Sequence, residues 1–165
     1  MANACAAAAQ QTKLPQVALL GGGSASGNAG RIEAFRQGLR ELGYTEGKNI
    51  LFEQRWADGK LDRLAAFAAE LVRLKMDIIV SAGPTVTRAL RKITSTMPVV
   101  MGFDDDPVGS GFVASLARPG GNITGLSTLS PELSAKQLEL LKEILPKISR
   151  VAVLGSSAHP GQVKH

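Results

Sequence analysis

The sequence predicts an α/β fold: a doubly wound parallel sheet of five strands, in the order 2-1-3-4-5, covered by helices. Short apolar runs alternate with segments of helical periodicity, which is the pattern of βαβ units. Four junctions that follow apolar runs are rich in small or hydroxyl residues, at residues 21–28, 82–85, 102–107 and 124–128. Right-handed crossovers between parallel strands then favour the doubly wound order. A chain of 165 residues that is 44% hydrophobic can bury one such core.

The first two βα units are predicted in the N-terminal half of the chain. Strands are expected over residues 16–20 and 49–55, and an amphipathic helix follows each. The first helix should end at Gly43, which readily adopts the left-handed conformation, and Asp58 should cap the second. The apolar stripes that predict the two helices are Ile32, Phe35, Leu39 and Leu42, then Leu61, Leu64, Ala68 and Leu71.

Three further strands and two helices complete the predicted sheet. Pro84 suits the first position of one helix, and Asp106 with Pro107 suits the N-cap and first position of the next. The expected strands are 76–80, 97–101 and 123–125, and the expected helices are 85–93 and 108–116. Beyond the sheet, an amphipathic helix over 132–145 and a buried strand over 149–154 are expected, and this strand would begin a second sheet.

The composition argues against nucleic acid, metal and membrane-spanning functions. The net charge is +5, but Lys and Arg are interleaved with Glu and Asp, and one Trp and one Tyr offer little for base stacking. Cys5, His159 and His165 cannot form a metal site of the usual spacing, so no structural metal is expected. No apolar run approaches the roughly 18 residues of a membrane-spanning helix.

The alanine-rich start of the chain has the small-residue character of a signal-peptide cleavage region. The charged and apolar regions that precede such a site are not seen, so two interpretations stay open: a start inside a signal sequence, or an ordinary alanine-rich tail. Lipid attachment at Cys5 is the weaker expectation, because Ala2 stands where leucine is usual.

The glycine-rich junction at residues 21–28 does not match a nucleotide-binding motif. Ser26 stands where the dinucleotide fingerprint needs its third glycine, and Asn28 stands where a phosphate loop needs lysine. A tight turn explains the glycines alone, whereas exposed amides at the start of a helix would still attract an anion.

The chain offers no evident catalytic set. Residues 16–125 contain no histidine, and no serine has the spacing of a nucleophile elbow. Asp104, Asp105 and Asp106 could hold a hard cation, but three consecutive residues cannot all point inward. We expect Asp106 to cap a helix and either Asp104 or Asp105 to face the cleft, where it would meet an ammonium group of a ligand or be solvated. Without a general base or a bound metal, an enzyme is not expected.

The polar residues at the predicted sheet edge suit a small zwitterion. Helix N-termini and the hydroxyls of Ser24, Ser26, Thr85 and Ser127 favour a carboxylate. The aspartates after the fourth strand favour a cation. An amino acid would satisfy both preferences.

Several segments resemble the family of ABC transporter substrate-binding proteins that includes tryptophan and phenylalanine binders. The resemblance extends over nearly all of residues 16–155. It is carried by EAFRQGLRELGY at 33–44, GKNI at 47–50, RWA at 55–57, DRL at 62–64, ELVRL at 70–74, DPVG at 106–109, LARPGGNITGLS at 116–127, ELSAK at 132–136 and VAVL at 151–154. Two departures are a first loop richer in glycine and Asp105 where the family commonly has glycine.

The resemblance implies a type I periplasmic-binding-protein fold, with ligand clamped between two lobes. The ligand-binding positions that it implies are Ser24, Ser26, Gly83, Pro84, Thr85 and Asp106, with no catalytic residue, metal or cofactor. It also implies a small-molecule solute, a permease of the inner membrane as partner, and a periplasmic or extracellular membrane-associated location.

The expected organisation follows from the same resemblance. Residues 1–15 would be a remnant of a signal or linker, 16–125 the N-terminal lobe, 126–131 the hinge between lobes, and 132–165 the truncated start of the second lobe. The last helix and strand would then expose an apolar surface that packs on the first lobe or on another copy. A ligand-sensing domain of a regulator, which uses the same fold, is the alternative function.

Overall fold

The computed structural model describes residues 13–128 and 130–152. It confirms the predicted sheet, with five parallel strands in the order β2-β1-β3-β4-β5. Because the strands are parallel, the loops that follow β1, β3 and β4 leave the sheet at the same edge. The strands are β1 (Gln16–Gly21), β2 (Leu51–Trp56), β3 (Ile78–Ala82), β4 (Val99–Phe103) and β5 (Ile123–Gly125).

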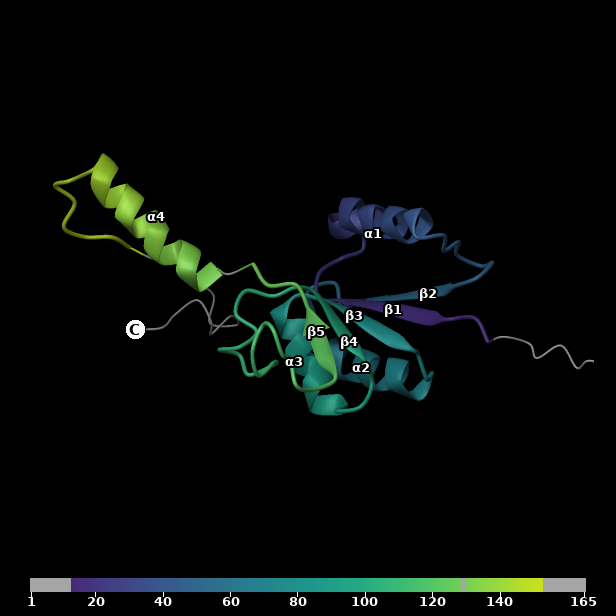
Figure 1. Cartoon of the computed structure of the whole chain (residues 1–165). Helices are drawn as coiled ribbons and strands as arrows, with labels where there is room; N and C mark the ends of the chain where they lie inside the picture. The colour runs from purple at the N-terminus through teal and green to yellow at the C-terminus, as the bar shows by residue number, and fades with distance from the viewer. Residues whose placement is uncertain (1–12, 129, 153–165) are drawn as a thin grey trace, which may run out of the picture.

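Helices lie on both faces of this sheet. The helix α1 (Ala29–Glu41) lies on one face, and α2 (Arg63–Arg73) and α3 (Pro84–Ile93) lie on the other (Figure 1). A short 3-10 helix, η1 (Ser26–Asn28), leads into α1. Pro84 occupies the first helical position of α3, as the sequence predicts.

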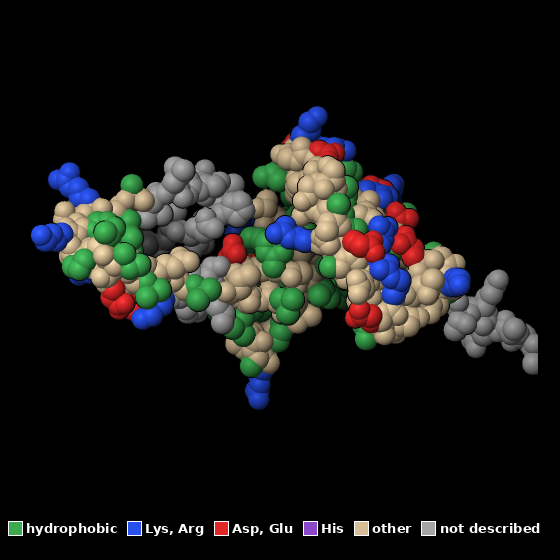
Figure 2. Space-filling model, turned by 90° about the horizontal axis from the view of Figure 1, so that it is seen from above, with side chains coloured by type: hydrophobic (Ala, Val, Ile, Leu, Met, Phe, Trp, Pro, Cys, Tyr) green, Lys and Arg blue, Asp and Glu red, His purple; other side chains and the backbone are tan. Residues whose placement is uncertain are grey.

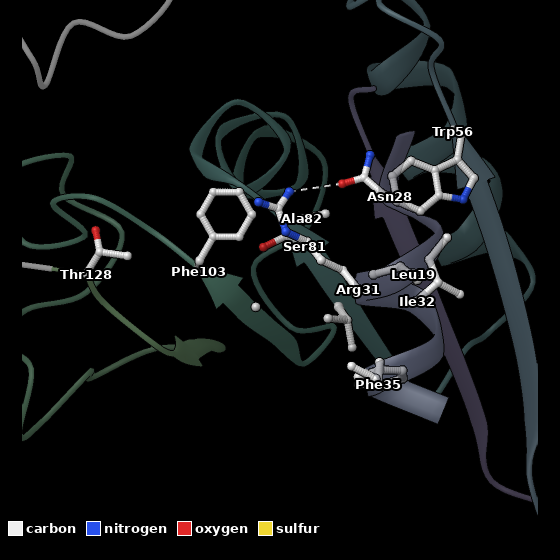
Figure 3. Close-up of a pocket in the computed structure, with 13 residues that line it drawn as sticks. Leu19, Asn28, Arg31, Ile32, Phe35, Trp56, Ser81, Ala82, Phe103 and Thr128 are labelled. Atoms are coloured by element: carbon white, nitrogen blue, oxygen red, sulfur yellow. Dashed lines mark hydrogen bonds between the residues drawn. The ribbon is translucent and has the colours of Figure 1, made fainter. Parts of the chain in front are cut away.

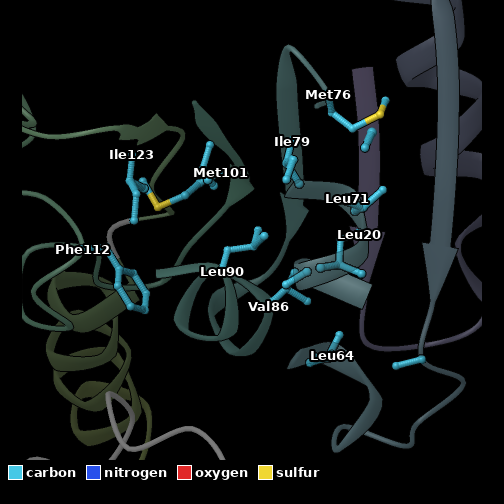
Figure 4. Close-up of a cluster of buried hydrophobic side chains, with 14 of the residues drawn as sticks. Leu20, Leu64, Leu71, Met76, Ile79, Val86, Leu90, Met101, Phe112 and Ile123 are labelled. Atoms are coloured by element: carbon cyan, nitrogen blue, oxygen red, sulfur yellow. The ribbon is translucent and has the colours of Figure 1, made fainter. Parts of the chain in front are cut away.

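The larger part of the hydrophobic core lies between the sheet and the α2–α3 layer (Figure 4). Side chains of successive strand residues alternate between the two faces. Leu20 and Ile79 therefore join this cluster, while Leu19 and Val80 join a smaller cluster under α1. From the helices, the larger cluster receives Leu64, Leu71, Val86 and Leu90.

Two local predictions are wrong. Asp58 does not cap α2, which begins at Arg63 after Asp62. No helix forms over residues 108–116, although the Oδ1 atom of Asp106 accepts the backbone N–H of Gly109 at 2.7 Å, as a helix cap would. The turn does not propagate because Gly111 adopts a φ of +68°, outside the helical region.

The last described helix, α4 (Ser130–Ile144), extends away from the sheet and its covering helices (Figure 1). Hydrophobic side chains gather on its surface in Figure 2, and Leu138, Leu140 and Ile144 are exposed. The expected packing of this helix on the sheet domain is therefore not observed, and self-association through it stays a prediction. Residues 149–152 are not in a strand, and the rest of the strand expected there lies outside the described residues.

Candidate functional site

A cleft of about 470 Å³ opens at the carboxyl edge of the sheet, and we call it the rim cleft. It lies where the loops after β1, β3 and β4 meet, the place where ligands of open α/β folds bind. Three of the six ligand-binding residues expected from the sequence, Gly83, Pro84 and Thr85, line it. Its other lining residues are Gly22, Gly23, Leu61, Ala82, Val86, Phe103 and Asp105.

The loop after β1 is held by its own hydrogen bonds. The carbonyl groups of Gly22 and Gly23 each accept a backbone N–H from the turn after β2, at 2.9 Å. The Ser24 hydroxyl accepts the N–H of Gly27 at 3.1 Å and lies 3.3 Å from the Ser26 hydroxyl. Ser24 and Ser26 thus lie in the loop that supplies the rim cleft with glycines, and their hydroxyls bond within that loop.

The loop after β3 places the start of α3 at the rim cleft. The Gly83 carbonyl accepts the N–H groups of Val86 and Thr87, each at 3.1 Å, and so closes the first turn of the helix. The buried hydroxyls of Ser81 and Thr87 lie 2.8 Å apart and satisfy one another. Thr85 is the second residue of α3, so it lies in the first turn of the helix, where the helix dipole favours negative charge.

The three consecutive aspartates after β4 have three different environments. Asp104 is buried, Asp105 lines the rim cleft, and Asp106 bonds to the backbone of the turn that follows. The sequence left open whether Asp104 or Asp105 faces the cleft, and the structure has Asp105 in the lining of the rim cleft. The side chain of Asp105 also accepts the Thr128 hydroxyl at 3.3 Å, which joins this loop to the segment after β5.

Burial raises the pKa of Asp104 from 3.8 to about 6, because its carboxyl group is withdrawn from water. The N–H of Asp106 donates to the Oδ1 atom at 3.3 Å, which opposes the rise. Within the described residues, the buried Oδ2 atom has no hydrogen-bond partner. Asp104 thus lines neither cavity, and its burial makes the carboxyl group easier to protonate than it is in water.

A second cavity, of about 510 Å³, lies beside α1 and is called the side cavity here (Figure 3). Its walls come from α1 and from β1, β3 and β4, and Phe103 lines both this cavity and the rim cleft. The sequence analysis missed Phe103 and Arg31. Phe103 lies in the junction at residues 102–107, which the sequence analysis did single out. Arg31 gives no comparable signal, because charged residues are common on the exposed side of a helix. The lining residues are Leu19, Asn28, Arg31, Ile32, Ala34, Phe35, Trp56, Val80, Ser81, Ala82, Gly102, Phe103 and Thr128.

The described segments contain no group of three or more His, Cys, Asp or Glu side chains that could hold a metal ion. None of the helices in these segments combines the length and apolar character needed to cross a membrane. The lining of the rim cleft includes backbone groups, Thr85 with its hydroxyl, Asp105 with its carboxylate and the aromatic Phe103. Such a set can bind a small polar molecule that has an apolar part.

Comparisons with known proteins agree with this description. A family model described as ABC transporter substrate binding protein matches residues 24–165. Over 123 residues, the chain is 32% identical to a tyrosine-binding protein of Clostridioides difficile (strain R20291), and the match covers 74% of the chain and 35% of that protein.

Two solved structures share the fold. A conserved domain protein from Vibrio cholerae is 35% identical with a TM-score of 0.72, over 82% of this chain and 45% of that one. An ABC domain from Streptococcus pneumonia in complex with L-Trp is 23% identical with a TM-score of 0.66, over 82% of this chain and 54% of that one. The chain thus spans between about a third and a half of the length of these relatives.

Proposed function

Because this chain belongs to the family of ABC transporter substrate binding proteins, we propose that it is the solute-binding component of an ABC-type uptake transporter. In this role it binds a small molecule and delivers it to a permease of the inner membrane. Such delivery requires a periplasmic or extracellular membrane-associated location. Its task is binding without chemical change, as expected of a substrate-binding protein.

The rim cleft is the observation that carries the proposal. Its lining joins the start of α3 and the Thr85 hydroxyl, which suit a carboxylate, to the carboxylate of Asp105, which suits an ammonium group. The ring of Phe103 supplies an apolar surface in the same lining. We therefore propose an amino acid or a related carboxylate as the solute, with an aromatic side chain as the first choice. The tyrosine-binding relative and the L-Trp complex support that choice.

The proposed binding positions are those that the family resemblance implied, Ser24, Ser26, Gly83, Pro84, Thr85 and Asp106. Asp105, which lines the rim cleft, joins them. We further propose that residues 16–125 form one lobe of a two-lobed clamp and that residues 126–131 form its hinge. The rim cleft would then be one side of the complete site, and a second lobe that begins at residue 132 would close over it. Hinge closure of this kind is common in binding proteins.

Isothermal titration calorimetry of the two-lobed protein with L-tyrosine, L-tryptophan, L-phenylalanine and small carboxylates tests the proposal. Thr85→Ala should weaken the binding of the preferred solute by roughly threefold to tenfold, because one hydrogen bond contributes about 0.5–1.5 kcal/mol. Thr45→Ala is the matched control, since Thr45 is exposed in the loop between α1 and β2, at the opposite edge of the sheet. Failure to bind every solute of the panel would refute the proposed function.

A further inference from the structure

We propose that the guanidinium group of Arg31 is a further anchor for the carboxylate of the solute, in addition to the start of α3 and Thr85, with the Phe103 ring as the surface beside it. The proposal rests on the proposed function, because it assigns a further residue to the same solute. Neither residue is among the positions that the family resemblance implied. The geometry of the side cavity carries the inference (Figure 3).

Arg31 lies in the first turn of α1, close to the carboxyl edge of the sheet. Its guanidinium carbon is 5.7 Å from the centroid of the Phe103 ring, a cation–π distance. Its Nη1 atom donates to the Oδ1 atom of Asn28 at 3.2 Å. Figure 3 shows the guanidinium group between these two side chains. Two contacts from different elements therefore orient the group before any solute binds.

Most of the hydrogen-bonding capacity of Arg31 is unused. A guanidinium group has five N–H donors, and within the described residues only the bond to Asn28 is formed. Arg36, Arg40 and Arg55, by contrast, each bind a glutamate carboxylate at 2.7–3.2 Å. An arginine without such a partner keeps its planar fork of donors for an external anion. Carboxylates accept from that fork in a bidentate manner.

The surroundings strengthen an interaction with an anion. Arg31 is the sole charged residue among the described residues that line the side cavity, and much of the wall is apolar, including Leu19, Phe35 and Val80. Arg31 itself is exposed, so the apolar walls reduce the screening of a charge pair formed there on one side only.

Phe103 connects the side cavity with the rim cleft. Arg31 lines the side cavity and Asp105 lines the rim cleft, while Phe103 lines both. A solute with its carboxylate at Arg31 can lay an aromatic side chain along Phe103. The reverse orientation would bring the ammonium group of the solute against the like charge of Arg31. The arrangement therefore sets both the orientation of the solute and the requirement for a free carboxylate.

Titration calorimetry with L-tryptophan and L-tryptophanamide tests the role of Arg31, because the amide lacks the carboxylate. Arg31→Gln should weaken L-tryptophan binding by roughly tenfold or more, the effect of losing a charge-assisted bidentate contact. The same substitution should change binding of the amide by less than about twofold. Arg40→Gln is the matched control, since Arg40 lies on α1 and pairs with the exposed Glu33. Equal losses for both solutes, or no loss for either, would overturn the proposal.

Two further measurements distinguish an unfolded variant from the loss of a binding contact. Thermal melting of Arg31→Gln checks that the variant is folded, and Arg31→Lys should recover part of the lost affinity because it restores the charge without the fork. If the wild-type chain binds no aromatic amino acid, the tightest carboxylate in a thermal-shift panel and its amide replace the tryptophan pair. Failure to bind any aromatic amino acid would refute the choice of an aromatic solute, but the role of Arg31 would still be tested with the other carboxylate and its amide. Absence of binding by every carboxylate in the panel would refute the anchor itself.

Discussion

Replacing Asp104 by asparagine should stabilise this protein at neutral pH. The side chain is 1% exposed, and within the described residues its Oδ2 atom has no hydrogen-bond partner. Burial raises the pKa of this carboxyl group to about 6, with a smaller contribution from the charge of Asp105, while Arg88 acts in the opposite direction. Asparagine has nearly the same shape and stays neutral at every pH, so it reproduces the protonated form of Asp104.

The size of the effect follows from the difference in pKa between the folded and unfolded states. The unfolded chain releases this proton near pH 3.8, whereas the folded protein holds it up to about pH 6. The folded state therefore binds more protons between these values, and the contribution of Asp104 to stability falls as the pH rises through that window. The difference between the two pKa values lowers the free energy of unfolding by roughly 3 kcal/mol above pH 6 and leaves it unchanged below pH 3.8.

Urea unfolding followed by the fluorescence of Trp56, the single tryptophan of the chain, measures the effect. The free energy of unfolding of Asp104→Asn minus that of the wild type should be near zero at pH 4. It should rise to roughly 3 kcal/mol at pH 7. Taking the difference removes the contributions of the other carboxylates, which the two proteins share.

Asp62→Asn is the control, because Asp62 is exposed and makes no capping hydrogen bond at the start of α2. Its stability difference from the wild type should stay within about 0.5 kcal/mol over the same pH range. A difference for Asp104→Asn that does not depend on pH would refute the reasoning. So would an asparagine variant that is less stable than the wild type at pH 7.

Two further substitutions test close contacts near the site. Gly125→Ala should destabilise the protein by more than about 1 kcal/mol in thermal melts. Gly125 has a φ of +141°, and an added Cβ atom would meet the backbone of β4. Gly38→Ala is the control: no atom lies near an added Cβ there, so this substitution should be neutral or stabilising. Thr87→Val should cost roughly 1–3 kcal/mol in urea unfolding by removing the partner of the buried Ser81 hydroxyl, whereas Thr87→Ser should retain most of the stability. If Gly125→Ala is as stable as Gly38→Ala, or Thr87→Val as stable as Thr87→Ser, the corresponding contact does not stabilise the protein.

The sequence was sufficient for the order of the sheet but not for the ends of its strands. The strand expected over residues 76–80 is found at Ile78–Ala82, and the one expected over 97–101 is found at Val99–Phe103. Apolar runs report where side chains are buried, whereas the hydrogen-bonded ladder continues into the polar Ser81. That residue is tolerated in the interior because its hydroxyl bonds to Thr87 of the next helix.

The site was predictable to the level of its loops and no further. The aspartates after β4 were recognised, but their separate environments depend on tertiary contacts such as the 2.9 Å bond from the N–H of Thr128 to the carbonyl of Asp104, between residues 24 positions apart. Asp106 forms the hydrogen bond of a helix cap, but it caps no helix. The helix expected after it is missing because a cap favours the first turn only, and Gly111 takes the chain out of the helical region.

An irregularity in the sheet explains how Phe103 comes to lie between the two cavities. Ser81 pairs with Met101, but Ala82 pairs with Phe103, so the register shifts by one residue and Gly102 is left as the extra residue of a bulge. Without the shift, Phe103 would follow the alternation of the strand and point to the same face as Met101, into the α2–α3 layer. The bulge instead directs the ring to the side cavity, over which Arg31 lies. The proposed binding surface thus depends on one extra glycine in an otherwise regular pair of strands.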